Sequence, residues 1–137
     1  MAQLFETRLT LEQKDILTRF AQAMLAGAAK RPQCTGVLWQ RGLISENTYE
    51  RFSSCAFGAA WEGDHPAFNP AVWIEYLNTG LNDIVYHFDL YRLPLVNNPA
   101  TGVRGEHLRA VIIDLNDKYR WTREQIAEWL LMLAADG

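Results

Sequence analysis

The chain has 137 residues, of which 49% are hydrophobic and 21% are charged. That length suits a single domain, and that balance is typical of a folded globular protein rather than a disordered or low-complexity one. The formal net charge of -3 argues against a dedicated nucleic-acid binder, because such proteins usually carry a basic surface.

The sequence predicts a protein without a membrane segment. No apolar run approaches the roughly 20 residues that a helix needs to cross a bilayer, and residues 1–6 lack the basic and apolar regions of a secretory signal. Two cysteines allow at most one disulfide, which is typical of a reducing compartment. We therefore predict a cytoplasmic location and one domain over residues 1–137, with residues 1–9 as a mobile N-terminus.

The first predicted helix covers residues 11–30. Thr10 and Gln13 have the spacing of a capping box, in which each side chain bonds an orphan amide at the start of a helix. The apolar residues that follow have the spacing of one buried helical face, and Pro32 prevents the helix from continuing. These apolar residues are Leu17, Phe20, Ala21, Met24, Leu25 and Ala28.

The region after this helix is less regular. Residues 33–44 are predicted as a loop, with a short extended piece at residues 37–39. Two short helices are expected to follow, over residues 46–52 and 55–62. The glycine and proline residues after position 62 end this stretch.

The middle of the chain predicts two more helical segments and a loop. Asn69 and Pro70 form a good helix start, and Gly80 a helix end. Residues 83–91 fit the apolar spacing of a strand and that of a helix, and helix is favoured because no partner strand is evident. Turn-forming residues predict a loop over 93–102.

The C-terminal part predicts two helices joined by a short turn. The first covers residues 104–118, and the second begins at Thr122, which forms another capping box with Gln125. Because few residues separate them, a tight helical hairpin is expected, packed on the first helix and on the segment around Cys55. The predicted fold class is therefore all-α, a compact single-domain bundle of five or six helices with a C-terminal helical hairpin.

Cys55 has the clearest potential for chemistry. It falls at a predicted helix start, where the helix dipole favours a thiolate, and a cysteine nucleophile also needs a nearby base. A cysteine-dependent hydrolase or transferase would draw on Cys55, His87, His107, Asn116 and Gln40. The residues that surround the cysteine in papain-like enzymes are missing. The favoured interpretation is that residues 55–60 are small so that another helix can approach closely, and no catalytic residue is favoured.

Charge is distributed unevenly along the chain. Residues 52–91 contain five acids and no Lys or Arg, so they carry -5, and the remaining chain carries 13 minus 11, or +2. An acidic face would favour docking to a basic partner. The acids are Glu62, Asp64, Glu75, Asp83 and Asp89. A weakly basic face is expected around Arg104, Arg109, Lys118, Arg120 and Arg123, although nucleic-acid binding is not favoured.

Tryptophan residues near turns, and an Asp/His pair on one helical face, are further candidates for binding. Trp61 and Trp121 adjoin predicted turns, where exposed aromatic residues can anchor an interface. Asp83 and His87 would share a helical face, but no Cys-x-x-Cys or His-Glu-x-x-His spacing is present. The sequence therefore predicts no metal site and no cofactor.

Two short motifs resemble those of a known family. The segment Cys55-Ala56-Phe57-Gly58-Ala59 and the later pair Asn116-Asp117 are similar to a C-A-x-G-A element and an N-D pair before a final helix. These motifs occur in a family of small bacterial and phage-encoded proteins of unknown function. The resemblance implies a compact helical domain without an established activity, and it marks Cys55, Gly58, Asn116 and Asp117 for attention. Residues 62–102 do not map onto the pattern.

The leading functional hypothesis is a small, non-enzymatic binding protein. Its predicted partner is another macromolecule, a protein, in a regulatory or phage-related setting. The expected binding residues are Trp61, Trp121, Glu62, Asp64, Asp83 and Asp89. Homo-oligomerisation is left open.

Overall fold

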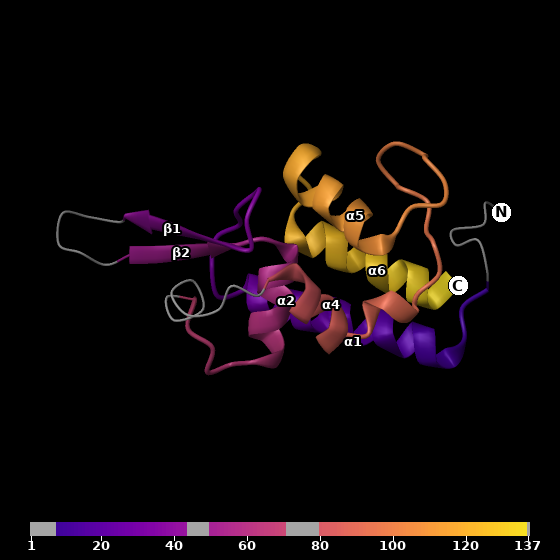
Figure 1. Cartoon of the computed structure of the whole chain (residues 1–137), viewed down its shortest axis with the longest axis horizontal. Helices are drawn as coiled ribbons and strands as arrows, with labels where there is room; N and C mark the ends of the chain where they lie inside the picture. Colours follow the sequence, from indigo (N-terminus) through magenta and orange to yellow (C-terminus); the bar gives the residue numbers. More distant parts are fainter. Residues whose placement is uncertain (1–7, 44–49, 71–79, 137) are drawn as a thin grey trace.

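A computed structural model describes residues 8–43, 50–70 and 80–136 of the chain. These residues are mostly helical, as predicted, with a two-stranded sheet (Figure 1). The regular elements are α1 (Leu11–Ala28), β1 (Trp39–Leu43), β2 (Glu50–Ser54), α2 (Ala56–Asp64), α4 (Leu81–His87), α5 (Leu108–Ile113) and α6 (Arg123–Asp136). Most of the predicted mobile N-terminus, residues 1–9, lies outside the described residues.

Helix α1 begins and is buried as its sequence predicts. Gln13 donates its backbone N–H to Thr10 Oγ1 at 3.1 Å, and its side-chain oxygen accepts the Thr10 N–H at 2.9 Å, so both halves of the capping box form. Leu17, Phe20 and Met24 are fully buried on the predicted face. The helix ends at Ala28, two residues before the predicted end.

Helices α1 and α2 approach so closely that their backbones touch. A Cβ atom added at Gly27 of α1 would lie 1.6 Å from the Ala59 carbonyl oxygen of α2, and one added at Gly63 would lie 1.8 Å from the Ala23 carbonyl oxygen. Ala59 and Ala60 are fully buried. Among the small residues after Cys55, Ala59 therefore faces α1, whereas a Cβ atom added at Gly58 would lie 2.5 Å from the Leu38 carbonyl oxygen, so Gly58 faces the segment before β1.

The segment before α2 is a β-hairpin and not a helix. Strands β1 and β2 pair antiparallel, with Trp39 opposite Ser54 and Leu43 opposite Glu50. The predicted helix over 46–52 is therefore wrong at residues 50–52, and its other residues lie outside the described ones. Strand formation here depends on pairing with residues 39–43, which the pattern of residues 50–54 alone does not show. The described parts of both strands extend away from the helices (Figure 1).

Helix α4 resolves the ambiguity of residues 83–91 in favour of helix. It ends at His87, Asp89 adopts a left-handed conformation with φ 60°, and a 3₁₀ turn, Leu90–Arg92, follows. Most of the helix predicted from Pro70 to Gly80 lies outside the residues that the structure describes.

The predicted loop over 93–102 is present and extends to residue 106. Val96 and Glu106 exchange two backbone hydrogen bonds of 2.8 and 3.0 Å, which close the base of the loop. Within it, the buried Asn98 side chain accepts the Ala100 and Thr101 amides. Helix α5 consequently begins at Leu108, four residues later than predicted.

The C-terminal helices are joined by a wide helical turn. Helix α5 continues into a π-helical turn, Asp114–Lys118, which the Tyr119 N–H closes by donating to the Asp114 carbonyl oxygen. Thr122 and Gln125 then form the predicted capping box at the start of α6, with bonds of 2.8 and 3.0 Å. Helix α6 packs against α1, and the buried hydrophobic residues form one core that extends from Leu9 to Leu133.

Arg123, at the start of α6, is buried and does not belong to a basic face. Its guanidinium donates to the carbonyl oxygens of Ala28, the last residue of α1, and of Arg31 after it, and to Ser54 Oγ at 2.8 Å. Burial lowers the pKa of this guanidinium. The expectation of a surface role for Arg123 is corrected accordingly, because the residue joins α1, β2 and α6.

Candidate functional site: a pocket beside Cys55

A pocket of about 210 Å³ brings together the two motifs that the sequence analysis singled out. Its walls come from the segment before β1, the start of α2, the first residue of α4, and α5 with its π-helical turn. It is lined by Gly36, Val37, Leu38, Cys55, Ala56, Phe57, Leu81, Ile113, Asn116 and Asp117.

Asn116 holds these segments together from the π-helical turn. Its side-chain oxygen accepts the Ala56 N–H at 3.1 Å and the Gln33 side-chain amide at 3.0 Å. Its side-chain nitrogen donates to the Cys34 carbonyl oxygen at 2.9 Å and to Asp117 Oδ1 at 2.7 Å. Because its hydrogen bonds are made inside the protein, this buried amide has a structural role in the pocket wall.

Asp117, next to Asn116, fixes the part of the pocket wall at Gly36. Its Oδ1 atom accepts the Gly36 N–H at 2.9 Å, and Gly36 has a φ of 81°, in the left-handed region that favours glycine. The Cys55 N–H donates to the Leu38 carbonyl oxygen at 3.0 Å, which attaches the same segment to the start of α2. The wall formed by residues 36–38 is therefore fixed at both ends.

Cys55 lies at the N-cap of α2, but its thiol is buried. Desolvation raises the pKa of this thiol to about 12, although the Gly58 and Phe57 amides oppose that shift. The neighbouring Cys34 is also buried, and desolvation raises the pKa of its thiol to about 11. Both cysteines are free, and both are neutral thiols near pH 7.

Of the residues named for a cysteine-dependent enzyme, only Asn116 lies beside Cys55 in this pocket. No hydrogen bond joins Cys55 to any of the three histidines, all of which lie in the described part of the chain. His87 Nε2 is 2.9 Å from Asp64 Oδ2, and His107 lines a different pocket. The side chain of Gln40 is exposed on β1. With a protonated thiol and no histidine hydrogen-bonded to it, this arrangement does not support nucleophilic catalysis.

The mouth of the pocket is apolar and accessible. Val37 is 51% exposed and Ile113 is 37% exposed, and both are large hydrophobic side chains. Leu38 and Leu81 are half-buried beside them. A mostly apolar cavity with exposed aliphatic residues at its mouth can take up an apolar side chain from another molecule.

Some of the acidic residues expected to form a docking face are bonded to other side chains of the protein. Glu62 is buried, and both of its carboxylate oxygens lie within 2.9 Å of Arg31 Nε. Its Oε2 atom also accepts the Trp39 indole N–H at 3.0 Å. The carboxylate of Glu62 is therefore not available to a partner.

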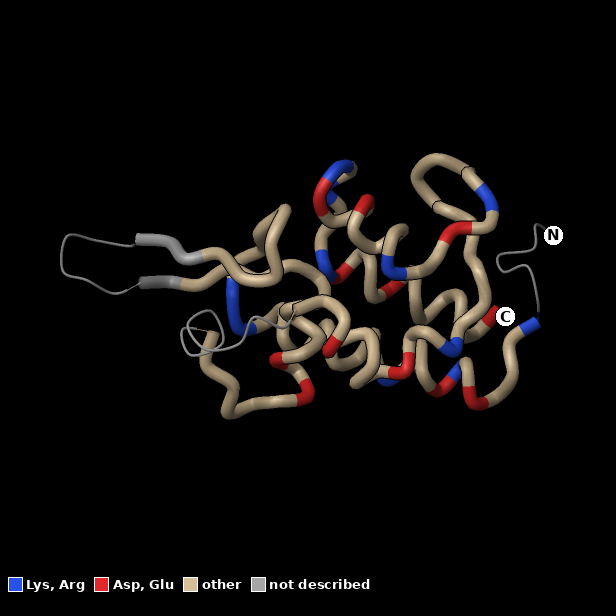
Figure 2. The backbone as a smooth tube through the Cα atoms, in the orientation of Figure 1, with Lys and Arg blue, Asp and Glu red and all other residues tan. Residues whose placement is uncertain are grey.

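The remaining acids of this segment are spread over several elements. Asp64 pairs with His87, Asp83 is half-buried in the first turn of α4, and Asp89 precedes the 3₁₀ turn. Arg19 of α1 donates to the His87 carbonyl oxygen at 2.8 Å, so a basic residue from outside the segment lies among them. Acidic and basic positions are interspersed over the helices (Figure 2).

The two tryptophans chosen as interface anchors are half-buried and lie apart from the pocket. Trp61 stacks on His65, with ring centroids 3.9 Å apart, and Trp121 lines a shallow surface pocket with Trp129 and Met132 of α6. No cluster of three metal-binding side chains occurs among the residues that the structure describes. No helix among these residues is long and apolar enough to span a membrane.

The motifs of the sequence include residues of the pocket wall but neither Val37 nor Ile113 at its mouth. The family resemblance singled out Cys55, Asn116 and Asp117, which the fold brings together. Val37 and Ile113 carried no signal of their own, because isolated exposed aliphatic residues are common on protein surfaces. Comparisons with protein families, curated proteins and solved structures find no match to this chain.

Proposed function

We propose that this chain is a small, non-enzymatic protein that binds another protein through the pocket beside Cys55. The observation that carries the proposal is the pocket itself, with its apolar lining, an uncharged thiol and a wall held by the hydrogen bonds of Asn116. Rigid apolar pockets that receive one anchoring side chain commonly supply much of the energy of protein association.

The size and the rim of the pocket favour a protein partner. At about 210 Å³ and with a mostly apolar lining, it suits a single apolar side chain. Asp117 Oδ2 makes no hydrogen bond within the described structure, whereas Oδ1 accepts two. A partner segment with an apolar anchor followed by Lys, Arg or a free backbone N–H would satisfy both features.

Several expectations from the sequence belong to the same proposal. The chain is taken to be a compact helical bundle with a C-terminal hairpin, related to the bacterial and phage-encoded family that its motifs resemble, and acting in the cytoplasm. The two free cysteines support a reducing compartment. Self-association would use the same apolar mouth and is tested together with partner binding.

The test begins with selection of binding peptides from a displayed random library against the full chain. Affinities of the selected peptides are then measured for the wild type and for Val37→Asp and Ile113→Asp, which place a charge at the mouth. Each substitution is expected to weaken binding at least tenfold, since the new carboxylate must be desolvated. Native mass measurement of the free chain over a range of concentrations detects self-association.

The matched control is Val103→Asp, in the loop between Val96 and Glu106. Val103 is 50% exposed, almost the same fraction as Val37, but it does not line the pocket. Val103→Asp should leave the affinities unchanged. Equal weakening by all three substitutions, or by none of them, would contradict the proposal.

A further inference from the structure

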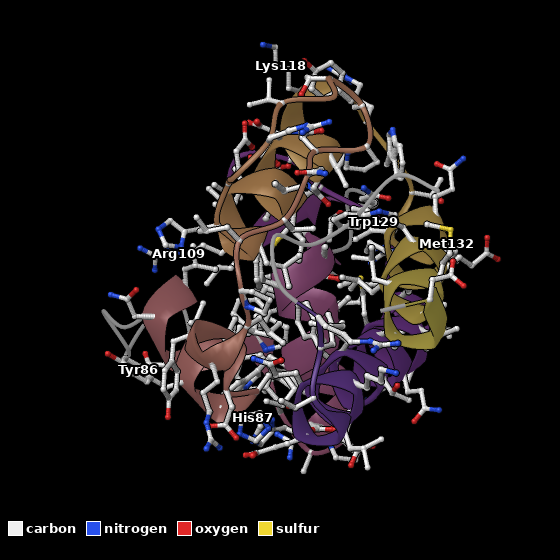
Figure 3. All side chains as sticks on the ribbon, turned by 90° about the vertical axis from the view of Figure 1, so that its right-hand side faces the viewer. Tyr86, His87, Arg109, Lys118, Trp129 and Met132 are labelled. Atoms are coloured by element: carbon white, nitrogen blue, oxygen red, sulfur yellow. The ribbon has the colours of Figure 1, made fainter. Side chains whose placement is uncertain are left out.

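A second pocket lies between α4, the 3₁₀ turn after it, and the start of α5. Its volume is about 270 Å³, and its lining is partly polar. It is lined by Asn82, Val85, Tyr86, Leu90, Tyr91, Leu93, His107, Leu108 and Arg109. Tyr86 and Arg109 project from α4 and α5 on the same side of the molecule, whereas Trp129 and Met132 of α6 lie on the other (Figure 3).

Arg109 brings an uncompensated positive charge to this pocket. Its Nη1 atom donates to Asn82 Oδ1 at 2.8 Å, which positions the guanidinium but leaves its charge unpaired. No acidic residue lines the pocket, and no ion pair of Arg109 occurs within the described structure. By contrast, Arg31 pairs with Glu62 and Arg92 pairs with Glu12.

Three further polar groups of the pocket make no hydrogen bonds of their own. The hydroxyls of Tyr86 and Tyr91 and the imidazole of His107 have no hydrogen-bond partner among the described residues. The tyrosines are 66% and 61% exposed, and their ring centroids lie 5.4 Å apart. Below them, Val85, Leu90 and Leu108 are buried and form an apolar floor.

We propose that this pocket binds a small organic anion, a carboxylate or phosphate monoester carried on an aromatic or short apolar group. The free N–H groups of Arg109 match the geometry of such an anion, because a guanidinium presents planar pairs of donors. The tyrosine hydroxyls and the imidazole can donate further hydrogen bonds to its oxygens. The tyrosine rings and the apolar floor suit the body of the ligand.

This inference does not depend on the proposed function. The two pockets share no lining residue, although α4 and α5 contribute to both. Loss of peptide binding at the Cys55 pocket would leave the anion site untouched, and the reverse also holds.

The test is a titration of the full chain, followed through backbone amide NMR shifts, with three probes of similar size. Phenyl phosphate and phenylacetate carry the two candidate anions, and phenylacetamide is the neutral control. We expect at least one anion to saturate shifts at residues 82–93 and 107–109, and to bind at least tenfold more tightly than the amide. The better anion identifies the ligand class. Equal affinity for the amide, or no saturable binding at millimolar concentrations, would overturn the inference.

Matched substitutions of two arginines test which positive charge binds the anion. Arg109→Gln should weaken binding of the anion at least tenfold, which corresponds to about 1.4 kcal/mol. Arg104→Gln removes the same charge from an exposed position that does not line the pocket, and it should have little effect. Circular dichroism confirms that both variants are folded. An unchanged affinity in Arg109→Gln, or equal weakening in both variants, would place the anion elsewhere and refute the site.

Discussion

Two regions of this protein treat their charged side chains in opposite ways. Where α1, β2 and α6 meet, Arg123 is buried and its guanidinium is bonded to carbonyl oxygens, and Glu62 is buried against Arg31. In the pocket between α4 and α5, Arg109 bonds only a neutral amide, and the side chains around it are unpaired. The first arrangement uses polar groups to join elements, whereas the second leaves them available to a ligand.

The difference between the two regions predicts different roles for residues of the same type, such as Arg123 and Arg109. A buried polar group with all its partners inside the protein contributes to stability, and removing it leaves other groups unsatisfied. A polar group that is exposed in a pocket and lacks partners contributes little to stability and can contribute much to binding. Substitutions at matched residues in the two regions therefore separate the two roles.

The largest expected difference in the free energy of unfolding is between substitutions of Arg123 and of Arg109. Arg123→Met should lower the free energy of unfolding by about 3 kcal/mol, because the carbonyl oxygens of Ala28 and Arg31 would lose their hydrogen-bond donor in a buried region. Arg109→Met should change it by no more than about 0.5 kcal/mol, since this side chain is exposed. Urea unfolding followed by tryptophan fluorescence measures both values.

The same experiment can refute the comparison. If Arg109→Met were as destabilising as Arg123→Met, the arginine in the pocket would be a structural residue and the distinction between the two regions would fail. If Arg123→Met were harmless, the carbonyl oxygens at the end of α1 would not need the guanidinium.

Local signals were sufficient to predict parts of the fold. The capping boxes at Thr10 and Thr122 predicted where α1 and α6 begin, because each consists of residues three positions apart. Apolar spacing likewise predicts the buried face of α1, whereas for residues 83–91 it fits a strand as well as a helix, and helix is favoured there because no partner strand is evident. Each of these features depends on residues that are neighbours in sequence.

Features that depend on distant residues could not be predicted in the same way. The local pattern predicts a loop and a helix where the β-hairpin lies, because its strands are defined by their pairing. The sequence predicts a basic face around Arg123, because the partners of this residue at Ala28 and Ser54 are remote in sequence. It predicts an acidic surface around Glu62 for the same reason, since the partner of Glu62 is Arg31.

The same distinction between local and distant features applies to the two candidate sites. Cys55, Asn116 and Asp117 were singled out by motif, but only the fold shows that they meet around one cavity. Nothing in the sequence connected Tyr86 with Arg109, because three separate elements build their pocket.

The next largest expected effect is a fall in the free energy of unfolding at high pH, which the two buried thiols cause. Burial raises the pKa values of Cys34 and Cys55 to about 11 and about 12, from an ordinary value near 9.0. Below pH 9 both thiols are protonated in the folded and the unfolded chain, so they do not oppose folding. Above pH 9 the unfolded chain ionises first, and stability falls as the pH rises towards the folded-state values.

Cys55→Ala isolates the contribution of one thiol. Between pH 9 and pH 11 the wild type should lose about 2 kcal/mol more unfolding free energy than Cys55→Ala, because ionisation of this thiol is suppressed only in the folded state. Urea unfolding at several pH values provides the two curves. Parallel curves would mean that the thiol ionises equally easily in both states, which would undermine its role as the neutral floor of the pocket.

The smallest expected effect on the free energy of unfolding comes from residues at the starts of α5 and α6. Thr122→Ala should cost about 1 kcal/mol of unfolding free energy, because its hydroxyl accepts the Gln125 N–H at 3.0 Å. His107 is at the N-cap of α5 but makes no side-chain capping bond, so His107→Ala should cost almost nothing and should instead weaken anion binding. Urea unfolding of both variants and a phenyl phosphate titration of His107→Ala measure these outcomes. A cost at His107 equal to that at Thr122 would show that the imidazole is needed by the helix and is not held ready for a ligand.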